Sequence, residues 1–217
     1  MSGRPRCLHR RRSRDERGAV AVEAALVLPI LFTVLFGIVD LSMLVRDEVS
    51  TTSATRIAAR IAATGAGAGP GTCVTRPSAP PCTSQFSPAL AQAAADAIQR
   101  SGMSMPKDSI DYILVYKAND QGFPGTGTSM PSDCSATTDC VMFTWYDADD
   151  KFRWAGGSWD SKTINGCLNQ SDMVGVYLHA THDWASGIFG SSIGVDDRAV
   201  SRFEPLDPQT CAPGTHG

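Results

Sequence analysis

The chain reads Arg17-Gly18-Ala19-Val20-Ala21-Val22-Glu23 and then continues without a charged residue from Ala24 to Val39. Short apolar segments before Glu23 and after Asp40 lengthen this apolar region to about 27 residues. A helix needs roughly 20 largely apolar residues to cross a bilayer. The sequence therefore predicts one membrane-spanning helix over residues 19–45, with one acid near each end.

Charge is distributed unequally on the two sides of this segment. Seven arginines precede Gly18 and are opposed only by Asp15 and Glu16, whereas the rest of the chain holds 12 basic and 20 acidic residues. Basic residues are retained on the cytoplasmic side of a membrane. We therefore expect a single-pass protein of the cell membrane with a cytoplasmic N-terminus and an extracytoplasmic C-terminal domain. Because the arginines directly adjoin the apolar helix, they do not favour a nucleic-acid partner.

The apolar segment lacks the processing site of an ordinary secretory signal. No small-x-small sequence and no cysteine follow Val39 closely, and the nearest run of small residues, 62–66, comes more than twenty residues later. A signal peptidase needs such small residues just after the apolar region. We therefore expect the helix to be retained in the mature protein.

The helical pattern continues outside the predicted membrane segment. Four-residue steps relate the apolar residues Val45, Val49, Ile57 and Ile61, and Ala54, Ala58 and Ala62 lie beside them. Such spacing predicts a helix with one apolar side, here over residues 46–64. Repeated Gly and a Pro make residues 65–72 a linker that ends it. We expect this outer half to lay its apolar stripe against a small globular domain.

Residues 17–31, together with Phe36-Gly37-Ile38-Val39-Asp40, resemble the start of TadE-like proteins, the pilin-like proteins of the tight-adherence (Flp) pilus apparatus. The resemblance implies a prepilin-type leader, residues 1–18, that a membrane prepilin peptidase cuts between Gly18 and Ala19. Glu23 then becomes the fifth residue of the mature chain, which is the assembly glutamate of pilins. A weaker resemblance to the same family lies in the strand-like pattern of residues 174–205.

The predicted cleavage gives the acid Glu23 a chemical role. Cleavage creates an α-amine at Ala19 with a reference pKa near 8, so a cation lies at the membrane rim. A carboxylate one helical turn away, or on a neighbouring subunit, offsets the cost of leaving that charge unpaired. The alternative is that Glu23 pairs with Arg17 and has no role in assembly.

The remainder of the chain, residues 73–217, is expected to form an extracytoplasmic α+β head. The pattern predicts a helix from Ser87 to about Arg100, with Leu90, Ala94, Ala97 and Ile98 as its buried stripe. Alternation and β-rich composition predict mostly antiparallel strands, separated by loops at 119–139 and 153–170. The expected strands are 110–116, 141–146, 173–181 and 195–203. Together with the long N-terminal helix, membrane-embedded in its first half, this is a pilin-like fold.

Cysteine usage agrees with an oxidising location for the head. Cys7 precedes the membrane segment, and six further cysteines follow it: Cys73, Cys82, Cys134, Cys140, Cys167 and Cys211. Six cysteines permit 15 pairings. Proximity along the chain favours Cys73–Cys82 and Cys134–Cys140, which leaves Cys167–Cys211 to hold the C-terminal tail. No C-x-x-C spacing indicates a zinc site, and we predict no metal or other cofactor.

The sequence offers little that points to catalysis. His179, His182 and Asp183 lie close together, but on a strand the two histidines face opposite sides. Residues 147–150 begin like a calcium loop, yet Lys151 and the residues after it break that pattern, so a charged turn between strands is expected. The four tryptophans are expected mainly to pack within the head. We therefore predict that the protein is not an enzyme.

Two functions of different classes remain. The first is a TadE-like minor pseudopilin that takes part in assembly of a pilus for surface attachment, with the major pilin and other pseudopilins as partners. Small residues at Ala24, Ala25 and Gly37 allow close packing of neighbouring helices in lipid, and the large head fits an accessory position better than the shaft. The second is an uncleaved membrane anchor whose head binds a ligand or a cell-wall partner.

Overall fold

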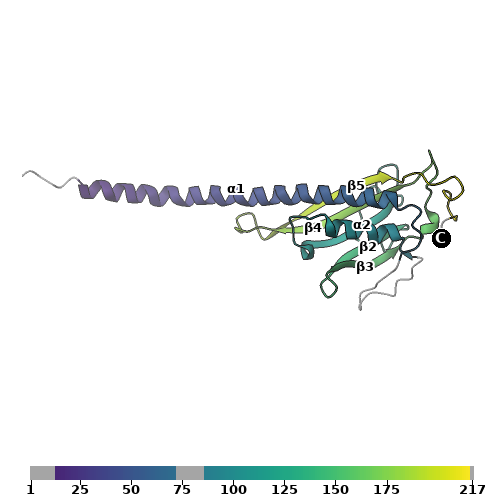
Figure 1. The fold of residues 1–217 in the computed structure, drawn as a ribbon. Helices are drawn as coiled ribbons and strands as arrows, with labels where there is room; N and C mark the ends of the chain where they lie inside the picture. Colours follow the sequence, from purple (N-terminus) through teal and green to yellow (C-terminus); the bar gives the residue numbers. More distant parts are fainter. Residues whose placement is uncertain (1–12, 72–85, 216–217) are drawn as a thin grey trace, which may run out of the picture.

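The structure, a computed structural model, describes residues 13–71 and 86–215, with side chains from residue 18 onward. It consists of one long helix, α1 (Ser13–Thr64), and a head gathered around the last third of that helix (Figure 1). At about 1.5 Å per residue, the 52 residues of α1 span about 78 Å. The helix begins six residues before Ala19, where the sequence predicts its start, and it ends at Thr64, the last residue of the predicted outer half.

The head contains a second helix, α2 (Ala89–Arg100), and a five-stranded antiparallel sheet in the order β3-β2-β1-β4-β5. The strands are β1 (Ile110–Ala118), β2 (Cys140–Tyr146), β3 (Lys151–Ser158), β4 (Met173–Asp183) and β5 (Ser192–Arg202). Short 3-10 turns, η2 (Lys107–Ser109) and η3 (Ser161–Thr163), precede β1 and β4. This confirms the predicted α+β fold with a long apolar N-terminal helix.

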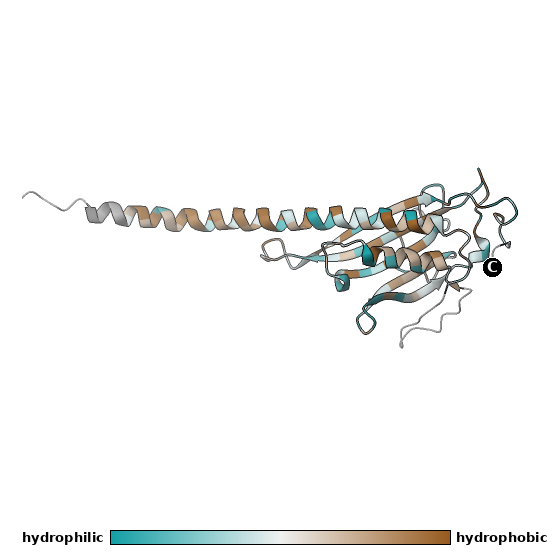
Figure 2. Ribbon diagram, in the orientation of Figure 1, coloured by the Kyte–Doolittle hydropathy of each residue, from teal (hydrophilic) through white to brown (hydrophobic). Residues whose placement is uncertain are grey.

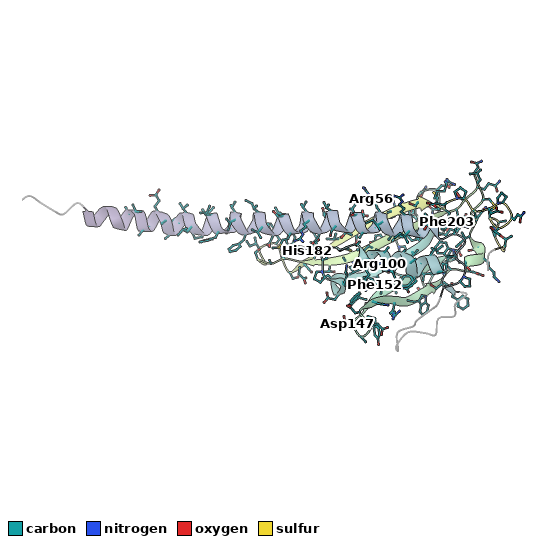
Figure 3. The ribbon with its side chains drawn as sticks, viewed as in Figure 1. Arg56, Arg100, Asp147, Phe152, His182 and Phe203 are labelled. Atoms are coloured by element: carbon teal, nitrogen blue, oxygen red, sulfur yellow. A yellow bond between two sulfur atoms is a disulfide. The ribbon has the colours of Figure 1, made fainter. Side chains whose placement is uncertain are left out.

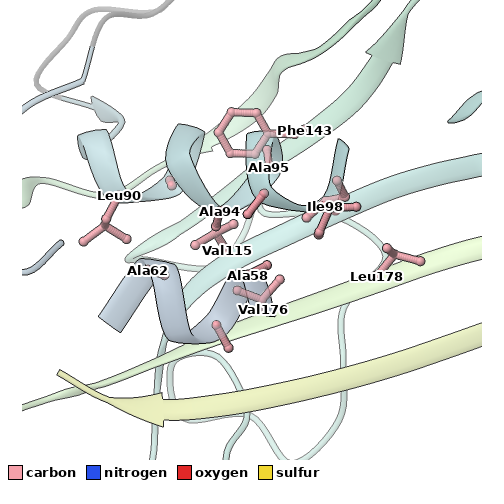
Figure 4. Close-up of a cluster of buried hydrophobic side chains, with 14 of the residues drawn as sticks. Ala58, Ala62, Leu90, Ala94, Ala95, Ile98, Val115, Phe143, Val176 and Leu178 are labelled. Atoms are coloured by element: carbon pink, nitrogen blue, oxygen red, sulfur yellow. The ribbon is translucent and has the colours of Figure 1, made fainter. Parts of the chain in front are cut away.

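The core lies between the sheet and the two helices. α1 packs against α2, β4 and β5. Leu90, Ala94, Ala97 and Ile98 are buried, as the sequence predicts for α2. They lie over Val115 and other apolar residues of the sheet (Figure 4). Small side chains let α1 and α2 approach closely, and a Cβ at Gly65 would lie only 2.7 Å from the Cβ of Leu90.

The head packs on only one part of the apolar stripe that the sequence predicts for the outer half of α1. Ala54, Ala58 and Ala62 are fully buried, whereas Val49 is 65% exposed and Ile57 is 42% exposed. Close approach to α2 needs short side chains, because a β-branched residue in the same place would hold the two helices apart. The alanines of the stripe therefore contact the head, and its Val and Ile residues face outward, apart from Ile61, which is partly buried.

Strand β3 corrects a second prediction, since the sequence analysis assigns residues 153–170 to a loop. Phe152 and Trp154 alternate along β3 and are buried. The glycines that follow them weaken the strand signal, and the register shifts opposite Met142 and Phe143, which marks a bulge. Gly157 has φ +81°, and a Cβ there would overlap the carbonyl oxygen of Cys140. Only glycine allows β3 to pair so closely beside that cysteine.

Asp139 provides a test of stability against pH. Burial raises the pKa of its carboxyl group, and the Thr163 hydroxyl and the charge of Lys117 offset this only in part. A raised pKa in the folded state means that stability is lost as the pH rises through that value. Asn does not ionise and tolerates the φ of 52° at this position. Asp139→Asn is therefore expected to raise the thermal midpoint at pH 7 and to change it little below pH ~4, the reference value for Asp, in calorimetric scans. A variant less stable than the parent at pH 7 would contradict this.

Candidate functional site

The first candidate site is the exposed apolar surface of α1. All described side chains from Gly18 to Phe36 are exposed, and nearly all of them are apolar (Figure 2). Among the described residues, this is the one helix long and apolar enough to cross a membrane, and only 6% of its most apolar part is buried. A core helix of a soluble protein would be mostly covered, so a continuous apolar surface of this size indicates a lipid or partner-binding role. The helix is a candidate single-pass membrane anchor.

Glu23 lies exposed within this apolar surface, five residues after Gly18. Among the described side chains, which begin at residue 18, no hydrogen bond or ion pair satisfies its carboxylate. The side chain of Arg17, its alternative partner, lies outside that set. The Gly18–Ala19 peptide bond lies within α1, and a Cβ at Gly18 would have no neighbour within 4 Å. Among the described residues, nothing therefore covers the predicted cleavage site at Gly18. The leader and its removal stay predictions.

A second site, which the sequence analysis misses, joins α1 to the turn between β4 and β5. Asp40 is only 1% exposed. Ser186 donates hydrogen bonds to the Asp40 carboxylate from its hydroxyl and from its backbone N–H, the latter at 3.3 Å. One turn earlier on α1, a Cβ at Gly37 would lie 3.6 Å from the ring of Phe189. Gly37 is therefore covered by the protein itself and does not offer the helix-packing surface expected of it.

A third contact continues this junction toward the head. Asp47 Oδ2 lies 2.6 Å from His182 Nδ1, and Ser104 donates a hydrogen bond of 2.6 Å from its hydroxyl to Asp47 Oδ1. The side chains of His182 and Asp47 are 6% and 13% exposed. They line a cavity of ≈ 300 Å³ between α1, the segment after α2 and the end of β4. Figure 3 shows His182 beside α1. The helix and the sheet are thus joined by two acids of α1, Asp40 and Asp47.

The histidines lie on opposite faces of the sheet, as expected. His179 is on the outer face, where its Nδ1 contacts Asp196 and its Nε2 lies 3.7 Å from Asp111. The Tyr112 ring stacks on the imidazole with a centroid distance of 5.0 Å. In residues 13–71 and 86–215, no group of three or more His, Cys, Asp or Glu side chains is placed to hold a metal ion. The outer cluster is thus a half-exposed group of one imidazole, two carboxylates and a tyrosine ring.

Residues 147–150 form the turn between β2 and β3. The backbone N–H of Asp149 bonds to the Tyr146 carbonyl at 3.2 Å, and the Asp149 carboxylate pairs with Arg153 at 2.8 Å. The acidic run that begins like a calcium loop is therefore a charged turn. Its carboxylates follow the hairpin and do not converge on one point.

In the part of the chain that the structure describes, two disulfides lie at the end of the head farthest from the candidate membrane segment. They join Cys134 to Cys140, the pairing that proximity along the sequence favours, and Cys167 to Cys211, the pairing that it leaves. The expected partners Cys73 and Cys82, like Cys7, lie outside the described residues.

The tryptophans do not form a common ligand site. Trp159 is buried against Phe203, with ring centroids 6.4 Å apart, and Trp154 is also buried. Trp184 differs, because it contacts both His182 and Phe189 in the turn that covers Gly37. Packing thus accounts for the two tryptophans buried in the head, while Trp184 belongs to the junction with α1.

Comparison with known protein families identifies one match, the TadE-like protein family, over residues 18–60. The match begins at the predicted cleavage site and contains Glu23, Asp40 and Asp47. It confirms the resemblance seen in the N-terminal sequence and indicates membrane association and a role related to the tight-adherence pilus. The α+β head after residue 86 lies outside the match. Searches of curated proteins and of solved structures found no match for this chain.

Proposed function

We propose that this protein is a TadE-like minor pseudopilin that takes part in assembly of a tight-adherence pilus for surface attachment. The observation that carries the proposal is the long exposed apolar surface of residues 18–36, interrupted by the single acid Glu23. Glu23 and Asp40 are seventeen positions apart, which is about 26 Å of helix. This length is close to the hydrocarbon thickness of a bilayer. The helix can therefore pack against neighbouring helices in lipid while the head stays outside.

Cleavage at Gly18 would place the new α-amine of Ala19 one turn from Glu23. In lipid, an unpaired charge is costly, so the amine and the carboxylate of adjacent subunits favour one register of helix packing. The small side chains of Ala24 and Ala25 allow neighbouring backbones to approach. Beyond the membrane, the outward stripe of Val45, Val49 and Ile57 continues this surface. The same stripe that fails to contact the head is thus available to a second helix.

The size and place of the head favour an accessory position in the filament. The head covers α1 only from Gly37 onward, and it holds one side of the helix from residue 54 to residue 63 fully buried. A subunit of the shaft must be surrounded by helices on several sides, which this arrangement restricts. We therefore place the protein at the tip or at the base of the pilus.

Glu23→Ala in cells that carry the pilus system tests this proposal. Loss of the only acid within the exposed apolar surface is expected to lower the amount of this protein that co-purifies with sheared pili at least ~10-fold, which corresponds to about 1.4 kcal/mol of assembly free energy. Glu48→Ala is the matched control, since Glu48 is an exposed glutamate on α1 outside the predicted membrane segment. Equal recovery of both variants would exclude the assembly role of Glu23.

An uncleaved membrane anchor is the second candidate, and one observation favours it. α1 continues without a break through Gly18–Ala19 back to Ser13, whereas a peptidase acts on an unwound bond. Intact mass spectrometry of the protein from membranes separates the two candidates. A chain that begins at Ala19 supports the pseudopilin, and a chain that retains residues 1–18 supports the anchor.

A further inference from the structure

The turn between β4 and β5 is the part of the head nearest the membrane segment. β4 and β5 pair up to Asp183 and Ser192, and the turn between them, residues 184–191, lies beyond the last pair. In Figure 1 this turn extends along α1 toward its N-terminal end, ahead of the rest of the head. From Trp184 to Val195 the sequence holds no charged residue, and Asp183 and Asp196 flank it. An uncharged tip therefore points toward the bilayer.

The depth of this tip follows from its contacts with α1. Asp40 marks the outer end of the apolar segment, and Phe189 lies over Gly37, three residues or about 4.5 Å further toward the membrane interior. When Glu23 is at the inner rim of the hydrocarbon layer, Asp40 is at its outer rim, because the two residues are about 26 Å apart. Phe189 then lies at the outer edge of the hydrocarbon layer.

The composition of the tip fits that position. Ile188 is 45% exposed and Phe189 is 49% exposed. Trp184 packs beside Phe189, with ring centroids 5.2 Å apart. Aromatic side chains favour the boundary between headgroups and acyl chains. At this depth the Asp40 carboxylate also needs hydrogen-bond donors, because it would otherwise meet lipid without a partner. The hydroxyl and the N–H of Ser186 are those donors.

We propose that the turn of residues 184–191 inserts Ile188 and Phe189 into the outer interface of the bilayer. It thereby holds the head at a fixed height and orientation on the membrane surface. The inference needs α1 to be embedded in the membrane, and it is independent of the role in pilus assembly. The occupant is lipid because the tip lies beside the part of α1 that is itself in the membrane. A pilin helix in the same place is the competing outcome of the test.

Photocrosslinking tests this directly on the full chain. Phe189→p-benzoylphenylalanine is reconstituted in nanodiscs of palmitoyl-oleoyl phosphatidylcholine and irradiated, and lipid adducts are counted by mass spectrometry. Leu168→p-benzoylphenylalanine is the control, because Leu168 is 68% exposed but lies in the loop of Cys167, at the opposite end of the head. We expect at least ~10-fold more lipid adduct at residue 189, as for a group that resides in the interface. Equal adduct at both residues, or only protein adducts at 189 in cells, would overturn the proposal.

A second measurement uses the native tryptophan of the turn and leaves Ile188 and Phe189 unchanged. Lipids brominated near the carbonyl end of the acyl chains quench tryptophan at short range. The quenched fraction is measured for the parent chain and for Trp184→Phe, and their difference belongs to Trp184. We expect Trp184 to account for most of the quenching by these lipids. No difference between the two chains would place the turn outside the bilayer.

Discussion

Replacing Cys167 and Cys211 together by Ser is expected to lower the free energy of unfolding of the head by about 4 kcal/mol. The bond closes a loop of 44 residues. The chain entropy that such a crosslink removes from the unfolded state corresponds to about 4 kcal/mol for a loop of this length and to about 2 kcal/mol for a loop of six residues. Removal of the shorter Cys134–Cys140 bond, with a separation of 6, is therefore expected to cost about half as much.

The native contacts of the C-terminal tail indicate which part of the head will open first when the Cys167–Cys211 bond is removed. Gly166 donates a backbone hydrogen bond of 2.9 Å to Cys211 and accepts another of 2.9 Å from Leu206. Glu204 bonds through its N–H to the carbonyl of Ala63 at 3.0 Å, near the end of α1. The disulfide thus holds in place a segment that also provides a hydrogen-bond donor for a carbonyl in the last turn of α1. Amide exchange in residues 204–215 should rise before that of the sheet.

Guanidinium unfolding in detergent micelles, followed by tryptophan fluorescence, measures both double variants on the same chain. The slope of free energy against denaturant shows whether the unfolded state has also changed. If loss of the long-loop bond cost no more than loss of the short-loop bond, the entropic account of the tail would be wrong.

Much of the fold can be predicted because its elements carry long periodic signals. The apolar region after Glu23 predicts the N-terminal helix, and regular alternation predicts β1, β2, β4 and β5 to within a few residues. β3 is missed because Gly156 and Gly157 interrupt its aromatic alternation. Gly157 is needed because β3 lies very close to Cys140, and a local sequence pattern does not show such a contact between distant segments.

Which part of the apolar stripe of α1 contacts the head could not be predicted, for a related reason. Hydrophobicity favours Val49 and Ile57 as the buried side, but the distance between α1 and α2 is set by how small the intervening residues are. Ala54 and Ala58 satisfy that distance. When a helix makes contacts on two sides, its small residues can pack against its own head while its larger apolar residues stay free to contact a partner protein.

The junction acids are missed because their partners are remote in sequence. Asp40 and Ser186 are separated by 146 positions, and Asp47 and His182 by 135. One signal is available in the sequence: an acid at the end of a membrane segment needs a donor. Ser186, inside an uncharged aromatic turn, is such a donor, but only the pairing of β4 with β5 directs that turn toward Asp40.

Asp47→Ala is expected to destabilise the head by about 2 kcal/mol, since a buried hydrogen-bonding group left without its partner costs about 1–3 kcal/mol. The substitution leaves His182 without its acceptor next to a cavity between α1 and β4, and it removes one of the hydrogen-bond partners of Ser104. Because the lost contacts join helix to sheet, the expected effect is on the cooperative unfolding of both. The same guanidinium titration in micelles measures it.

A matched control lies on the opposite face of the sheet. Asp196 contacts His179 as Asp47 contacts His182, but its side chain is 52% exposed. Water replaces a lost partner at such a site, so Asp196→Ala is expected to cost less than about 1 kcal/mol. The double change His182→Ala and Asp47→Ala should cost clearly less than the sum of the two single changes, because Asp47→Ala alone already leaves His182 unpaired. Additive effects would show that Asp47 stabilises the head through its place on α1 and not through His182.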